Sequence, residues 1–219
     1  MDAIITQNLI DVFAVLMLLL SLLAIATTRI GQLLNAFSLQ SLALSALAVV
    51  VAVSTGHTEL YLIAVITIGV KVVLIPWFMK YTVEHIKVGR DVDSSLGIPG
   101  SLLLSAILIT IAYFITEPLI ATADTITRDC LAISLAIVFI GLFMMTTHRK
   151  AMTQAVGLLM MENGLFLGVI SISYGMPLII ELGIFFDVLM AAVIIGVFAS
   201  RISRIFDSSD TSLLRRLKD

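Results

Sequence analysis

Residues 59–81 read ELYLIAVITIGVKVVLIPWFMKY and indicate the class of fold. A helix needs about 20 mostly apolar residues to cross a bilayer, and residues 60–79 supply that length. Lys71 stands in the middle of them. Because a charged side chain at the centre of a membrane helix costs about 2.5–3.5 kcal/mol on insertion scales, this lysine points to a function.

The same apolar pattern recurs along the chain. The 219 residues are 60% hydrophobic and 13% charged, with a mean hydropathy of +1.14, whereas soluble domains are about 45–50% apolar and about 25% charged. The sequence therefore predicts an all-α, polytopic membrane protein. We expect seven transmembrane helices, at residues 9–27, 33–54, 60–79, 101–117, 129–147, 153–173 and 178–200.

The basic residues predict the orientation of these helices. With seven spans, Arg128 falls on one side of the membrane and Lys71 within it, and the other basic residues all fall on the opposite side. These are Arg29, Lys80, Lys87, Arg90, Arg149, Lys150, Arg201, Arg204, Arg215, Arg216 and Lys218. The positive-inside rule then places the N-terminus outside and the C-terminus in the cytoplasm, with the protein in the inner (cytoplasmic) membrane.

Three parts follow from this arrangement. Residues 1–100 hold helices one to three and a cytoplasmic loop, residues 101–128 hold a connecting fourth helix, and residues 129–219 hold helices five to seven and a basic cytoplasmic tail. Similar residues at matching helix ends leave open whether helices one to three and five to seven are an internal repeat.

Composition also excludes several classes of function. A net charge of −2 argues against a polybasic nucleic-acid binder, and the single cysteine, Cys130, against a disulfide framework or a self-contained iron–sulfur cluster. The histidines are far apart and fall in loops, where we expect them to be solvated: His57, His85 and His148. No phosphate loop or nucleophile elbow is present, so we expect no catalytic site, metal or cofactor of the chain's own.

Three ionisable residues lie near the middle of predicted spans: Lys71, Glu162 and Asp187. Asp11 and Glu181 lie about one turn inside the outer edge, within reach of interfacial water. Intramembrane ionisable residues typically mark ion or proton paths. We therefore expect a midplane proton path formed by Glu162, Asp187 and Lys71, with Glu181 as an outward-side relay. The alternative is that these residues pair and hold helices together.

The surroundings of two of these residues support exchange of protons. Glu162 lies in GLLMMENG (157–164), where Asn163 adjoins it and Gly164 allows close approach of another helix. Desolvation favours the neutral form of such a carboxyl group, so its proton can be exchanged near neutral pH. Pro76 lacks a backbone donor and is expected to loosen the helix beside Lys71. Sodium is the competing ion, but the sequence suggests no cluster of Ser, Thr and Asn around Glu162 or Asp187.

Three segments resemble one known family: GLLMMENG (157–164), residues 59–81, and ELGIFFDVLMAAVIIGVFASR (181–201). They are similar to component E of hydrogenase-4, a membrane protein of formate hydrogenlyase-type, energy-converting [NiFe] hydrogenases. The last three helices also resemble the small K subunit of respiratory complex I and its counterpart in Mrp-type antiporters. In those proteins the pattern is Gly-Leu-Glu-x-Met-x-Asn. In this chain Leu159 stands where that pattern has its glutamate, and the acid, Glu162, comes three residues later. The carboxylate therefore keeps about the same helix face but shifts by about 4.5 Å.

This resemblance implies a role and partners. The chain would be a non-catalytic member of a hetero-oligomeric complex, with antiporter-like membrane subunits and cytoplasmic [NiFe] hydrogenase and iron–sulfur subunits. Glu162 and Asp187 would fill the roles of the two buried acids of the K-type helices. Two other functions stay open: a stand-alone or Mrp-like cation/proton antiporter component, and a purely structural membrane spacer.

Overall fold

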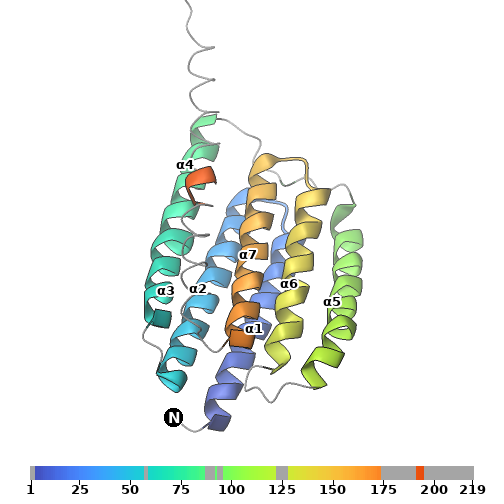
Figure 1. Ribbon diagram of the computed structural model, residues 1–219. Coiled ribbons are helices and arrows are strands. Elements are labelled where there is room, and N and C mark those ends of the chain that lie inside the picture. Colours follow the sequence, from blue (N-terminus) through green and yellow to red (C-terminus); the bar gives the residue numbers. More distant parts are fainter. Residues whose placement is uncertain are drawn as a thin grey trace, which may run out of the picture.

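A bundle of long, mostly antiparallel helices makes up the protein (Figure 1). The computed structural model describes residues 3–56, 59–86, 92, 96–121, 128–173 and 191–194. Its helices are α1 (Ala3–Ala26), α2 (Ile30–Thr55), α3 (Glu59–Thr67), the π-helix η1 (Ile68–Leu74), α4 (Ile75–Ile86), α5 (Gly97–Ala121), α6 (Arg128–Thr147) and α7 (Ala151–Ser173). No strand occurs among these described residues.

Six helical segments are long and apolar enough to cross a membrane: Ile5–Ala26, Ile30–Thr55, Leu60–Val83, Gly97–Pro118, Cys130–Thr147 and Ala151–Ile170. They match the first six predicted spans, so the all-helical class and these six candidate membrane-spanning helices are confirmed. Of the seventh stretch, only residues 191–194 are described; they are helical, and Ala191 and Ile194 are buried. The count of seven and the orientation of the termini stay predictions.

The arrangement of the helices places α7 among several neighbours. In Figure 1, α3, η1 and α4 stack end to end along one flank and α5 lies along the other, with α7 and α6 between them. Helix α7 packs most extensively on α6 and also contacts α2, while α1 contacts α2 and α6. Side chains of α7 can therefore meet side chains of α2 and η1 inside the bundle.

Two large apolar clusters and a smaller one, of Ile25, Ile140 and Phe143, fill the interior of the described bundle. One large cluster contains Met17, Leu44, Ala64 and Leu167 among its members, and the other contains Ala24, Phe37, Ile75 and Met160. On each of α1, α2, the third span and α7, the chain passes from one cluster to the other near the middle of the bundle. Between the clusters these helices bury polar side chains, among them Ser21, Gln40, Ser41, Lys71, Glu162 and Asn163.

Candidate functional site

The third span loses its α-helical geometry around Lys71. Residues Ile68–Leu74 form a π-helix, and at its end the N–H of Ile75 donates to the carbonyl of Val70, five residues back. The next residue, Pro76, has no N–H to donate and its ring would crowd the carbonyl four residues back in an α-helix. The predicted loosening beside Lys71 is therefore confirmed, and it takes the form of a π-helical turn, a feature frequent at functional sites.

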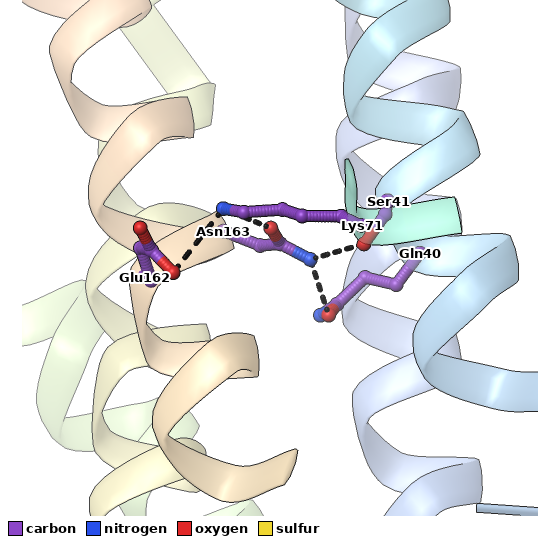
Figure 2. A network of polar contacts seen from close by, with 5 residues as sticks. All are labelled: Gln40, Ser41, Lys71, Glu162 and Asn163. Carbon is purple, nitrogen blue, oxygen red and sulfur yellow. Dashed lines mark hydrogen bonds and ion pairs between the residues drawn. The ribbon is translucent and has the colours of Figure 1, made fainter. Parts of the chain in front are cut away.

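Lys71 reaches from this turn to α7, where it meets Glu162 and Asn163 (Figure 2). Its Nζ lies 3.4 Å from Glu162 Oε2 and donates to Asn163 Oδ1 at 3.0 Å. The same Nζ lies 5.0 Å from the centre of the Phe166 ring. Lys71 and Asn163 are 0% exposed and Glu162 is 2% exposed, so this ion pair is fully inside the protein.

A chain of hydrogen bonds continues from Asn163 into α2 and α1. Asn163 Nδ2 donates to Gln40 Oε1 at 3.2 Å and to Ser41 Oγ at 3.0 Å (Figure 2). Gln40 Nε2 donates to Ser21 Oγ at 2.7 Å, and Ser21 Oγ donates to the carbonyl of Met17 at 2.9 Å. Four membrane helices thus contribute to one buried polar layer: α1, α2, η1 and α7.

This polar layer lies between the two large apolar clusters. Along α2 the order is Phe37, then Gln40 and Ser41, then Leu44; along α7 it is Met160, then Glu162 and Asn163, then Leu167. Both sides of the layer are therefore closed by packed hydrocarbon side chains. In such surroundings the effective dielectric is low, so a change of charge at one member acts strongly on the others.

Glycines set the position of α7 against α6. A Cβ added to Gly164 would lie 3.0 Å from the Ser134 carbonyl oxygen and 2.9 Å from Ile137. One added to Gly141 would lie 2.7 Å from the Gly157 carbonyl oxygen. The predicted close approach of another helix at Gly164 is confirmed, and the partner helix is α6. Because α6 covers this side of α7, the face that carries Asn163 is directed toward α2 and η1.

Sequence reasoning found one half of the site and missed the other. It identified Lys71, Glu162 and Asn163, which the structure brings together. Gln40, Ser41 and Ser21 were missed because they carry no charge. An amide in the middle of the apolar stretch 33–54 was the signal available, since an unsatisfied amide is costly in hydrocarbon. Asp187 and Glu181 lie outside the described residues, and their place in the path stays a prediction.

One expectation, about His148, was wrong. Gln40 and Ser41, from a helix remote in sequence, bring oxygen-bearing side chains to Asn163, the residue next to Glu162, and the choice between proton and sodium stays a prediction. His148 is 2% exposed rather than solvated. Its ring Nδ1 lies 3.0 Å from the Met144 carbonyl oxygen, which folds the imidazole back onto the end of α6. Burial lowers the pKa of His148 below its ordinary value of 6.5, although the Met144 hydrogen bond acts in the opposite direction.

Comparison with known proteins gives similarity over almost the whole chain. The chain is 30% identical over 212 residues to the uncharacterized protein Rv0085 of Mycobacterium tuberculosis, and the match covers 96% of each. It is 25% identical over 210 residues to hydrogenase-4 component E of Escherichia coli K12, covering 96% of this chain and 97% of the relative. The protein of that name from Shigella flexneri matches equally well. No family model matches the chain, and no solved structure matches it significantly.

Proposed function

From its similarity to hydrogenase-4 component E over 96% of the chain, we propose that this chain is a member of that family and a membrane subunit of a multi-subunit hydrogenase complex. Its partners are antiporter-like membrane subunits and cytoplasmic [NiFe] hydrogenase and iron–sulfur subunits, which carry out the redox chemistry of H2 or formate. The complex lies in the cytoplasmic membrane. The role of this chain is to place charged residues in the membrane and couple proton movement to that chemistry.

The observation that carries the proposal is the buried pair of Lys71 and Glu162, 3.4 Å apart. Such a pair is a poor source of stability, because desolvation of both ions offsets their attraction and an apolar pair of similar volume is often as stable. Its presence in the middle of the membrane helices therefore favours a function. A proton carrier is the function that a carboxyl group and an amine in contact support best.

A proton fits this site better than a sodium ion does. Sodium needs several oxygen ligands that are free to bind it. Here the amide oxygens of Asn163 and Gln40 and the hydroxyl oxygens of Ser41 and Ser21 each accept a hydrogen bond from within the layer. The cation among these oxygens is the ammonium group of Lys71, which a sodium ion would have to displace. Of these oxygens, Asn163 Oδ1 accepts from the lysine, and the other three accept from the side-chain amides of Asn163 and Gln40.

In this proposal Glu162 accepts and releases the proton, and the charge of Lys71 sets how readily Glu162 does so. Two unit charges 3.4 Å apart interact by roughly 5 kcal/mol at an effective dielectric of about 20. A small displacement of Lys71 on its π-helical turn would therefore change how strongly the Glu162 carboxylate is stabilised. Asp187 and Glu181 act as further carriers in the remainder of the path, with Glu181 as the outward relay.

Glu162→Gln tests the role of the pair in the assembled complex. The amide keeps the size of the side chain but cannot exchange a proton, so the complex should assemble and oxidise H2 with an artificial acceptor while proton pumping into inverted vesicles is lost. Glu117→Gln is the matched control, because Glu117 is an exposed glutamate on α5. Replacing sodium by potassium in the buffer should leave wild-type pumping unchanged. Pumping that requires sodium would favour the cation antiporter alternative instead.

Membership of a complex is tested separately by affinity purification in mild detergent. A tag on this chain should recover hydrogenase and antiporter-like subunits in fixed proportion. Recovery of the chain without them, from cells that express the whole complex, would favour a stand-alone transporter.

A further inference from the structure

The hydrogen bonds of the polar layer all run in one direction. The ammonium of Lys71 donates to Asn163 Oδ1, and Asn163 Nδ2 donates to Gln40 Oε1 (Figure 2). Gln40 Nε2 then donates to Ser21 Oγ, and Ser21 Oγ donates to the Met17 carbonyl. Each amide therefore turns its oxygen toward Lys71 and its NH2 group away from it. We call the series Lys71, Asn163, Gln40, Ser21 and Met17 the donor chain.

Both ends of the donor chain fix this direction. An ammonium group has three donors and no acceptor, so it can only meet the oxygen of Asn163. A backbone carbonyl can only accept, so Ser21 and Gln40 must donate toward Met17. Turning the Asn163 amide around would place its NH2 group against the Lys71 ammonium and its oxygen against Gln40 Oε1, and so would break both of these bonds.

We propose that Gln40 is a positioning residue that holds the Lys71 side chain beside Glu162 through Asn163, so that the Glu162 carboxylate keeps its stabilising partner. This inference rests on the proposed exchange of protons at Glu162. It adds a division of labour: Gln40 and Asn163 hold the lysine in place, and the Glu162 carboxyl group gains and loses the proton.

Aligned dipoles are the physical cause. Every member of the donor chain presents its negative end to the Lys71 ammonium, and hydrogen bonds in series polarise and strengthen one another by about 10–30% each. The face of the Phe166 ring, 5.0 Å from Nζ, adds a further negative surface that favours a cation. A neutral amine could still donate to Asn163 but would gain less from both. The ammonium therefore has stabilising partners that do not depend on the state of Glu162.

Other charged groups on the described neighbours of α7 lie away from this level. Helix α6 carries Arg128 and Asp129 at its start, and α2 is preceded by Arg29. Helix α1 carries Asp11, on the far side of Met17 from Ser21. Lys71 is thus the charged group that faces Glu162 from these described helices, and Asp187 of the seventh stretch lies outside the described residues.

The test is an infrared titration of the full-length chain in lipid nanodiscs. The carboxyl band that disappears in Glu162→Gln identifies Glu162, and its intensity is followed against pH. In Gln40→Met the donor chain is cut, the ammonium is less firmly held, and the carboxylate is less stabilised. The pH midpoint of the band should therefore rise by about one unit, the effect expected for loss of one buried hydrogen bond.

Two further variants separate positioning from simple loss of packing. Ser21→Ala removes a link farther from Lys71, so it should raise the midpoint in the same direction but by less. Ser45→Ala is the matched control, because Ser45 on α2 donates a buried interhelical bond to the Ala64 carbonyl at 3.1 Å without joining the donor chain. It should leave the midpoint unchanged. Ser21→Ala also keeps the test decisive if Gln40→Met does not fold.

The outcomes distinguish this inference from the proposed function. The role of Gln40 is overturned if the midpoint is unchanged or lower in both Gln40→Met and Ser21→Ala. It is also overturned if the midpoint shifts equally in Ser45→Ala. Either result counts even if Glu162→Gln abolishes pumping. A graded rise in the midpoint supports the role of Gln40. If Glu162→Gln pumped normally in the assembled complex, that result would overturn only the proposed function.

Discussion

Gly141→Ala tests whether close packing of α6 on α7 holds the polar layer in place. A Cβ on Gly141 would lie 2.7 Å from the Gly157 carbonyl oxygen and 2.8 Å from the backbone nitrogen of Met161, the residue before Glu162. Ordinary van der Waals contact begins near 3.4 Å, so backbone must move by about 0.7 Å. Overpacking of this kind costs about 1–3 kcal/mol. At roughly 2–4 °C per kcal/mol for a chain of this size, the melting temperature should fall by about 2–12 °C.

The assay is thermal unfolding of the full-length chain in nanodiscs, followed by circular dichroism. Gly31→Ala is the matched control, because Gly31 is also helical but a Cβ there meets nothing within 4 Å. Alanine is the better helix former, so this control should be more stable than wild type by about 0.5–1 kcal/mol. If Gly141→Ala proved as stable as Gly31→Ala, the argument that glycine contacts fix α7 would be refuted.

Two other perturbations have defined outcomes. Lys71→Met should destabilise the protein by up to about 3–5 kcal/mol at pH 8, because it leaves a buried carboxylate without its cation, whereas the double variant Lys71→Met/Glu162→Met should recover most of that loss in thermal unfolding. A double variant no more stable than the single one would contradict the pairing. His148→Gln should remove a loss of thermal stability that wild type shows below pH 6.5. There the unfolded chain binds a proton that the folded chain does not, because burial lowers the pKa of His148; equal pH profiles for the two proteins would contradict this.

The sequence predicted the fold well because membrane spans depend on length and apolarity alone. Six spans were placed within a few residues of the helices observed, and the π-helical turn at Lys71 was anticipated as a loosening before Pro76. A single proline allows that inference because its missing donor acts locally.

Which residues meet Glu162 could not be predicted in the same way. Gln40 is 123 residues from Asn163 in sequence, and their contact depends on how α2 packs on α7, which apolar periodicity does not determine in helices that are hydrophobic all round. The burial of His148 likewise depends on how the turn after α6 folds back on the bundle. Positions within one helix were therefore predictable, and contacts between helices were not.

The central claim, that Glu162 carries protons coupled to redox turnover, is tested most directly by one ratio. In inverted vesicles that contain the assembled complex, the number of protons taken up per H2 oxidised is measured for wild type, Glu162→Gln and Glu117→Gln. We predict that H2 oxidation continues in all three and that the ratio falls to near zero in Glu162→Gln alone. A wild-type ratio in Glu162→Gln would contradict the account.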